Sequence, residues 1–295
     1  MRVFKDKLAK RLMQALTLLS LLILALMGAG LYYKSSAIIR ANSVWELLST
    51  SEWSPLAGKF GFLTFILGSI YVTALAILIA LPVSLLTALY LTEKAKSWVR
   101  RVVFPVLDIL AGIPSVVYGV WGVLIIVPFI ADVLGPHFVD YASGYSVLAG
   151  GVVLSVMIMP LLVSLFVEIF STVPREFKEA SFSLGATRWQ TSRRVVVRKA
   201  TPGIIAAVAL AISKAFGETL AVLMVCGNMV RQPKSLFDSC YPLPALIANN
   251  YGEMLSLPMY ESALMFAALV LFAIILIFNA VSRIVLQRVE KNFKL

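Results

Sequence analysis

Residues 61–92 read GFLTFILGSIYVTALAILIALPVSLLTALYLT, a run of 32 residues without a charged side chain. A helix needs about 20 apolar residues to cross the ~30 Å hydrocarbon core of a bilayer, so this stretch is long enough to span a membrane. Similar apolar runs lie at 12–33, 102–131, 145–170, 202–226 and 259–282. The sequence therefore predicts an all-α polytopic membrane protein with six transmembrane helices.

The overall composition also favours a membrane protein. Hydrophobic residues make up 60% of the 295, and the mean hydropathy is +0.91, whereas soluble domains contain roughly 45 to 50% apolar residues. Gly and Pro interrupt several runs, which bundled helices tolerate because neighbouring groups satisfy the freed backbone. The alternating ~10-residue strands of a β-barrel would not give continuous apolar runs, so that class is excluded.

Basic residues are distributed unevenly along the chain. Twenty of the 26 Lys and Arg residues lie in the two tails and in loops 92–101 and 171–201. Because basic residues near span ends are retained in the cytoplasm, we expect a multi-pass protein of the cytoplasmic (inner) membrane with both termini cytoplasmic. The net charge of +11 follows from this bias and from contact with anionic lipid headgroups, so it gives no indication of nucleic-acid binding.

The first span has basic residues before an apolar run, as a secretory signal does. Its apolar region is longer than the roughly 7 to 15 residues of a signal, so we expect it to be retained as a transmembrane helix. The chain is then divided into residues 1–60, with the N-terminal tail, first span and outer loop, and residues 61–295. The second part is expected to be a five-helix core with cytoplasmic helices at about 174–199.

Motifs of enzymes and metal sites are missing from the sequence. It has no Gly-x-x-x-x-Gly-Lys-Ser/Thr phosphate loop, no His-Glu-x-x-His and no Gly-x-Ser-x-Gly. The single His137 falls in an outer loop without a second metal ligand nearby. We therefore do not expect an enzyme, and we expect no cofactor or metal ion bound to this chain.

Residues 171–201 form a long polar segment on the predicted cytoplasmic side. Pro174 suits the first turn of a helix, and Gly185 permits a turn with positive φ. Thr187 can then cap a second helix that extends through Arg198. The segment therefore predicts a helix, a tight turn and a basic helix.

The centre of this segment, Glu179-Ala180-Ser181 with Gly185, has the features of a docking surface. Small side chains at Ala180 and Ser181 let another surface approach closely. A solvated basic loop that lies on lipid headgroups is the alternative. The spacing of Glu, small residues and Gly favours a helix that inserts into a groove of a soluble partner.

At these residues the chain resembles the permease subunits of bacterial ATP-binding-cassette importers. Their cytoplasmic signature is Glu-Ala-Ala, three residues, Gly, nine residues and Ile-x-Leu-Pro. The matching positions are Glu179, Ala180, Gly185, Val195 and Val197. Ser181 replaces the second Ala, and Arg198 stands at the position of Pro. The resemblance implies a type I importer (MetI-like) permease core whose residues Glu179, Ala180, Ser181 and Gly185 couple to a separate ATPase.

Four further motifs resemble the PstC family of phosphate importer permeases. They are Gly112-Ile-Pro-Ser-Val-Val-Tyr-Gly-Val-Trp-Gly122, Ser51-Glu-Trp-Ser-Pro55, Phe216-Gly-Glu-Thr219 and Leu246-Ile-Ala-Asn-Asn-Tyr-Gly-Glu253. The resemblance implies a subunit of an ATP-driven inorganic phosphate importer that forms half of the translocation pathway. It also implies a PstA-like permease partner, two PstB-like ATPases that hold ATP and Mg, and a PstS-like phosphate-binding protein outside.

Three other functions stay open at this point. Sulfate and molybdate permeases share the coupling loop, so another oxyanion is possible. The sister subunit PstA shares the Gly-Glu-Thr and coupling patterns but lacks the Ser-Glu-Trp-x-Pro segment. A proton-coupled secondary transporter is more distant, because the internal repeats of many such folds are not apparent.

Lys214 and Glu218 are charged residues inside the predicted fifth span. A charge at the centre of a span costs roughly 2.5 to 3.5 kcal/mol and usually has a function. Four residues apart, the two are expected on one helix face, where Lys before Glu is the weaker orientation for an ion pair. We expect them to act on the translocation path or against a partner subunit, with mutual neutralisation as the alternative. Ser115, Tyr118 and Thr219 either offer hydroxyls to a passing anion or pack.

The predicted outer loop Val230–Pro258 carries few charges and several large apolar residues. They are Phe237, Tyr241, Leu243 and Tyr251. Because aromatic residues are enriched in interface cores, this loop is expected to contact the soluble binding protein.

Four residues are assigned structural roles. Asp108 and Glu168 fall nearer to span ends, where carboxylates reach the interface at little cost. Cys226 and Cys240 flank or lie in the third outer loop, and both a buried thiol state and a disulfide are compatible with their spacing.

Overall fold

The computed structural model describes residues 2–252 and 258–293, and within them six helices are long and apolar enough to cross a membrane. These candidate spans are Ala9–Ala41, Leu63–Glu93, Ser115–Phe138, Val147–Ser171, Arg188–Phe216 and Met259–Arg288. The six-helix prediction is confirmed. The third and fifth spans begin and end elsewhere than expected, because both apolar runs contain a break in the helix.

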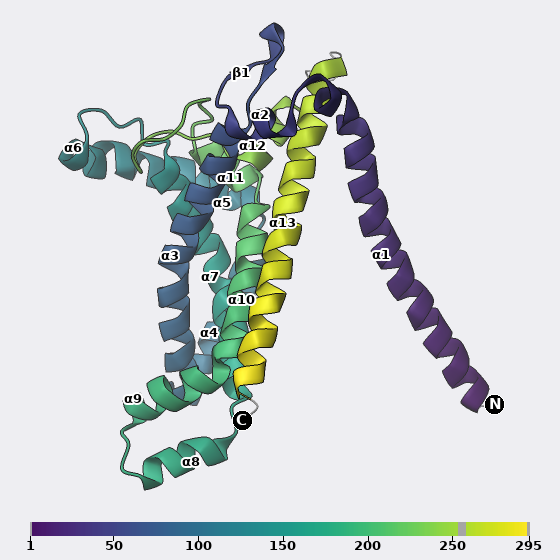
Figure 1. Ribbon diagram of the computed structural model, residues 1–295. Helices are drawn as coiled ribbons and strands as arrows, with labels where there is room; N and C mark the ends of the chain where they lie inside the picture. The colour runs from purple at the N-terminus through teal and green to yellow at the C-terminus, as the bar shows by residue number, and fades with distance from the viewer. Residues whose placement is uncertain (1, 253–257, 294–295) are drawn as a thin grey trace.

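The spans are built around a packed bundle with one helix set apart (Figure 1). In the bundle, α3 (Leu63–Glu93) packs along α7 (Val147–Ser171), and α10 (Val197–Phe216) packs against α7, α3 and α13 (Pro258–Phe293). The N-terminal half of α1 (Arg2–Ala41) leans away from the bundle, and its other half approaches α13. Lys34 Nζ donates to Glu261 Oε1 at 2.8 Å across that contact.

Small residues permit the close approach of α3 and α7. A Cβ atom added at Gly151 would lie 2.5 Å from the Leu75 side chain, which is an overlap. Ala76 and Ala80 of α3 are fully buried in the same cluster. Gly and Ala let helix backbones come together and gain dispersion contacts, which replace the hydrophobic effect as the driving force inside a bilayer. The pair α3 and α7 therefore forms the closely packed centre of the bundle.

The third apolar run is divided between two helices. Its first part belongs to α4 (Ser97–Gly112), and its second part begins with α5 (Ser115–Trp121). Ile113 and Pro114 between them are extended, with ψ of 129° and 142°. A residue before proline avoids the helical region, which explains the break. The chain continues through two π-helical segments and a short helix: η2 (Gly122–Ile126), η3 (Phe129–Leu134) and α6 (Gly135–Phe138).

The fifth span begins earlier and ends earlier than the apolar run suggested. It starts with α9 (Arg188–Thr191), passes through a π-helical turn, η4 (Ser192–Val196), and continues as α10 to Phe216. The expectation that the second helix of this segment ends near Arg198 is therefore wrong. Arg198 stands where the family signature has proline, and unlike proline it has a backbone N–H, so the helix continues to Phe216. The break comes instead at residues 217–219, before α11 (Leu220–Val225).

One end of the bundle is covered by a hairpin and two short helices. The hairpin consists of β1 (Trp53–Ser54), η1 (Pro55–Ala57) and β2 (Lys59–Phe60), and Trp53 pairs with Phe60 across it. The short helices are α2 (Val44–Ser49) and α12 (Leu243–Asn250). Figure 1 places them at the end opposite to α8 (Arg175–Ser183) and α9.

The two ends of the chain lie on the same side of the bundle as α8 and α9 (Figure 1). An even number of spans requires this arrangement. The fold thus agrees with the relative placement expected from the basic residues, and the assignment of that side to the cytoplasm stays a prediction.

Candidate functional site: the α8–α9 helices and the helix breaks

The turn between α8 and α9 has the geometry that the sequence predicted. Gly185 has φ of +80°, a left-handed conformation that glycine adopts without strain. Thr187 Oγ1 accepts from the N–H of Gln190 at 3.3 Å, and Gln190 Oε1 accepts from the N–H of Thr187 at 2.9 Å. This reciprocal capping box fixes the start of α9. The predicted turn and helix cap are confirmed.

The two sides of α8 differ in exposure. Glu179, Ala180 and Gly185 are exposed, so a partner protein can reach them. Ser181 is half-buried, and its Oγ lies 2.9 Å from Oγ1 of Thr191 in α9. Three of the four predicted coupling residues therefore lie on an accessible surface, and the fourth holds α8 against α9.

Large apolar side chains on this segment were missed in the sequence. Phe177, Phe182, Leu184 and Trp189 are exposed, and Leu184 is 89% exposed. Phe177, Phe182 and Leu184 stand in a polar segment before the fifth span, and Trp189 lies in the first turn of that span. These apolar residues are a signal that the sequence reasoning left unused. Exposed apolar residues gathered on one segment are typical of a protein-binding surface.

The second region of interest lies at the breaks in the third and fifth spans. Because α10 ends at Phe216, Glu218 does not continue its helical face, and the expectation that Lys214 and Glu218 share one face is wrong. The N–H groups of Gly217 and Glu218 donate to the carbonyls of Lys214 and Ala215 at 3.2 and 3.3 Å, which closes a tight turn. Both charged residues lie in the described part of the chain, and no ion pair within 4.0 Å joins them.

The two breaks lie together, because α5 packs against α11. Ser115, at the start of α5, lies close to the carboxylate of Glu218. Thr219 Oγ1 donates to the carbonyl of Gly217 at 3.3 Å, within the second break. Four of the five predicted pathway residues, Ser115, Lys214, Glu218 and Thr219, thus come from two adjacent interruptions of the helices.

Tyr118 has a different place from the other four. Its ring is buried, and its Oη donates to the carbonyl of Leu110 at 2.8 Å. This bond reaches from α5 back to the last turn of α4, where the same carbonyl also accepts from the N–H of Ile113 at 3.3 Å. The hydroxyl of Tyr118 therefore holds the break in shape.

The polar and charged side chains at these breaks are exposed or half-exposed on the surface of the chain. Lys214 is exposed, and Ser115 and Glu218 are half-buried. Asp108 is also exposed, and it lies four residues before the end of α4, beside the break rather than near the loop that precedes α4. Exposed charges within membrane spans are costly in lipid, so such residues face a protein partner or water.

A wide groove nearby has no suitable groups for an anion. It has a volume of about 590 Å³ and lies between α3, α10 and α13. Its lining is almost wholly apolar and includes Leu78, Ile212, Phe216 and Phe278. This groove suits lipid or apolar side chains, whereas Lys214 and its neighbours offer polar contacts.

The outer loop is more buried than expected. Tyr241 and Leu243 are buried, so the prediction that they contact a soluble partner is wrong. They pack under the loop because α12 folds back between α3 and α13. Phe237 is half-buried against Phe138, and Tyr251 is exposed. Residues 253–257 of this predicted loop lie outside the described residues.

Cys226 and Cys240 are both buried free thiols. The N–H of Cys240 donates to the carbonyl of Cys226 at 2.9 Å, which brings the two backbones side by side. Of the two states compatible with the sequence, the structure has the thiols.

The family to which the chain belongs follows from comparison with known proteins. The model of the family described as "Binding-protein-dependent transport system inner membrane component" matches residues 80–292. This range includes α8, α9 and both helix breaks. The chain belongs to this family, and it is a multi-pass membrane protein.

Two curated relatives give a more particular likeness. The "Phosphate transport system permease protein PstC" of Xylella fastidiosa (strain 9a5c) is 37% identical over 257 residues, which cover 82% of this chain and 79% of the relative. The "Probable ABC transporter permease protein YqgH" of Bacillus subtilis (strain 168) is 43% identical over 220 residues, 74% of this chain and 70% of the relative. The resemblance to PstC permeases is confirmed.

A solved structure supports the fold. A bacterial alginate ABC transporter, solved in complex with a pentasaccharide-bound periplasmic protein, contains a chain with a TM-score of 0.60 and 16% identity. The match covers 97% of this chain and 99% of that one. The predicted MetI-like importer permease fold is therefore confirmed.

Proposed function

We propose that this chain is the permease subunit of an ATP-driven importer of inorganic phosphate and forms half of its translocation pathway. The observation that carries the proposal is the similarity to PstC permeases over most of the chain. The exposed polar breaks support it, because a permease needs polar groups where an anion crosses the membrane. The chain acts in transport, and ATP hydrolysis belongs to other subunits.

The partner in the membrane is a PstA-like permease. The chain by itself leaves Lys214 exposed and Glu218 and Ser115 half-exposed. A second permease that covers this face would place these groups at the interface between the subunits. One fixed positive charge in a low-dielectric setting lowers the desolvation barrier for a dianion far more than it would in water. Glu218, four residues further along the chain, competes with the anion for this cation, so the anion does not bind too tightly for release.

On the cytoplasmic side the partners are two PstB-like ATPases, which hold ATP and Mg. Glu179, Ala180 and Gly185 are the residues of α8 and its turn that enter the ATPase groove. The exposed side chains Phe177, Leu184 and Trp189 enlarge that contact. Both termini are cytoplasmic in this arrangement, because they lie on the same side as α8.

Outside the membrane, a PstS-like phosphate-binding protein docks on the end that carries the hairpin and the loop from Val230. A cross-linker at Lys234 tests this contact. Asp238 is a poorer position, because its Oδ2 accepts from the N–H groups of Lys234 and Ser235 at 2.8 and 3.0 Å and shapes the loop. Capture of the binding protein at Lys234 supports the docking site, and capture of lipid or the partner permease alone contradicts it.

Reconstitution tests the proposed function directly. The chain is co-expressed with PstA-like, PstB-like and PstS-like subunits, purified as a complex and placed in proteoliposomes. We expect uptake of radiolabelled phosphate that requires ATP and the binding protein, with no uptake of sulfate or molybdate. Uptake of sulfate or molybdate in place of phosphate contradicts the substrate, and uptake driven by a proton gradient without ATP contradicts the class of transporter.

A further inference from the structure

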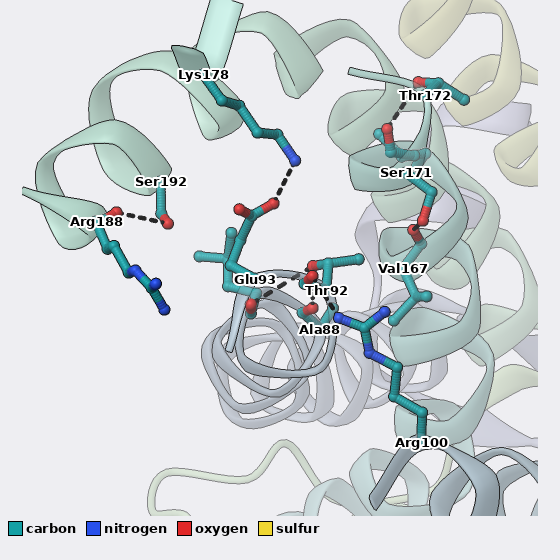
Figure 2. A network of polar contacts seen from close by, with 12 residues as sticks. Ala88, Thr92, Glu93, Arg100, Val167, Ser171, Thr172, Lys178, Arg188 and Ser192 are labelled. Atoms are coloured by element: carbon teal, nitrogen blue, oxygen red, sulfur yellow. Dashed lines mark hydrogen bonds and ion pairs between the residues drawn. The ribbon is translucent and has the colours of Figure 1, made fainter. Parts of the chain in front are cut away.

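A partly buried ion pair joins the cytoplasmic helix α8 to the end of α3. Lys178 Nζ donates to Glu93 Oε1 at 2.7 Å, across a separation of 85 residues (Figure 2). The two side chains are 20% and 15% exposed. The other ion pairs of the described residues, Lys34 with Glu261 and Lys59 with Glu52, have at least one side chain that is 58% exposed or more. Salt screens buried charges less than exposed ones, so the attraction between Lys178 and Glu93 is the least screened of the three.

The α3 side of this contact is firmly held. Arg100 Nη2 donates to the carbonyl of Thr92 at 2.7 Å, one residue before Glu93 (Figure 2). Lys94 Nζ lies 6.0 Å from the centroid of the Trp189 ring of α9, so the end of α3 also touches the second cytoplasmic helix. Because α3 packs along α7 through the membrane, a displacement of its end is passed to the centre of the bundle.

On α8, Lys178 lies on the helix face opposite to the residues that are proposed to bind the ATPase. Lys178 and Ser181 are three residues apart and both half-buried, and residues three apart share a helix face. Glu179 and Ala180 are exposed on the other side. One face of α8 is thus free for an ATPase, while Lys178 fixes the other to α3.

We propose that Lys178 and Glu93 form a strut that transmits the movement of α8 to α3, and that this strut sets how much solute is carried per ATP hydrolysed. Lys178 acts as a positioning residue, since it touches neither nucleotide nor solute. The proposal rests on the proposed function. A charge-assisted hydrogen bond at this distance is directional, so it resists both separation and sliding of the two helices.

The test removes one charge, then exchanges both. Lys178→Met keeps the apolar stem and loses the ammonium group, and Glu93→Gln keeps the shape and loses the charge. Each variant is assembled in the full complex in proteoliposomes, where phosphate uptake and ATP hydrolysis are measured together. We expect the ratio of phosphate carried to ATP hydrolysed to fall about fivefold, and the double variant Lys178→Glu with Glu93→Lys to recover at least half of it. Lys34→Met, which breaks the more exposed pair of Lys34 with Glu261 between α1 and α13, is the matched control and keeps the wild-type ratio.

A second readout separates this inference from the proposed function. Under this proposal, stimulation of ATP hydrolysis by the soluble binding protein also passes through α8, and it is measured without following the uptake of any solute. It should fall in Lys178→Met and return in the charge exchange. A wild-type ratio and wild-type stimulation in Lys178→Met overturn the strut, and so does a charge exchange that assembles but recovers neither. A complex that responds normally to the binding protein but carries no phosphate overturns the proposed substrate alone.

Discussion

The two ends of the bundle are held together by different forces. At the end that carries the hairpin, which is the predicted outer end, the Trp53 ring meets four other rings edge-on, with centroid distances of 5.0 to 6.0 Å. Phe62 and Phe65 are fully buried there. At the other end, α8 has no buried residue and is held by a few polar bonds, such as that of Ser181 with Thr191. The outer end is packed as a core, whereas α8 rests on the bundle and on α9 mainly through polar contacts.

This difference has an energetic consequence. Burial of one large apolar side chain stabilises a fold by about 1.5 to 3 kcal/mol, whereas a typical hydrogen bond contributes about 1 kcal/mol net. Segments with few buried contacts open at low free-energy cost, and elements that move in function are drawn from them. We therefore expect substitutions at the outer end to lower the stability of the fold, and substitutions at α8–α9 to change coupling at nearly constant stability.

The largest effect is expected for Phe65→Ala at the outer end. This side chain is fully buried and contacts Trp53 and Tyr241, so its removal leaves a cavity and should cost about 3 to 5 kcal/mol. Thermal unfolding of the purified complex measures the loss. Leu56→Ala, at the exposed tip of the hairpin, is the control and should change stability by less than about 0.5 kcal/mol. Equal melting temperatures for the two variants would show that the outer end is not a core.

Gly185→Val should produce the opposite pattern. A Cβ atom at Gly185 would meet no other atom within 4 Å, so the penalty is the positive φ alone, about 1 to 2 kcal/mol. We expect the turn to change shape, phosphate uptake to be lost for the most part, and ATP hydrolysis and assembly to persist. Gly185→Asn, which tolerates a left-handed backbone, should keep most of the uptake. Normal coupled transport in both Gly185→Val and Ala180→Trp would refute the role of this turn.

The features that were predicted correctly from the sequence depend on residues that are close together along the chain. The positive φ at Gly185 and the capping box at Thr187 depend on neighbouring residues only, so both were predictable. The six spans follow from length and hydropathy. The breaks were not predictable in this way, because Pro82 and Pro160 lie inside continuous helices while Pro114 begins a new one. The restriction on the residue before a proline allows a break at each of these positions, so the local sequence alone does not tell which proline interrupts a span.

The candidate sites show the same limit. Lys214 and Glu218 stand out in sequence because charges are rare in spans, but their relation depends on where α10 ends. Tyr241 and Leu243 were expected on the surface, since they belong to a loop, and packing of α12 buries them. Lys178 and Glu93 are 85 residues apart in the sequence, so no local sequence pattern predicts that they form a pair.

A smaller effect, confined to transport, is expected for Lys214→Gln. Loss of the positive charge should reduce phosphate uptake about tenfold, which corresponds to about 1.4 kcal/mol on the barrier. Because Lys214 is exposed in the chain alone, the melting temperature should hardly change. Lys214→Arg keeps the charge and most of the uptake. ATP hydrolysis should fall less than uptake does, and wild-type uptake in a fully assembled Lys214→Gln complex would make this residue structural.

The smallest effect is expected for Thr187→Ala, which removes the cap of α9 and should cost about 1 kcal/mol. Thr187→Ser keeps the hydroxyl and serves as the control. Hydrogen exchange of the backbone N–H groups of α9 should speed up about fivefold in the Ala variant, since that cost makes local opening easier. The melting temperature of the complex should not change, because the cap acts only on the first turn of the fifth span, while the rest of that span is packed in the bundle. If Thr187→Ala instead lowers the melting temperature as Phe65→Ala does, the two ends do not unfold independently, and α8–α9 is part of the same cooperative unit as the outer core.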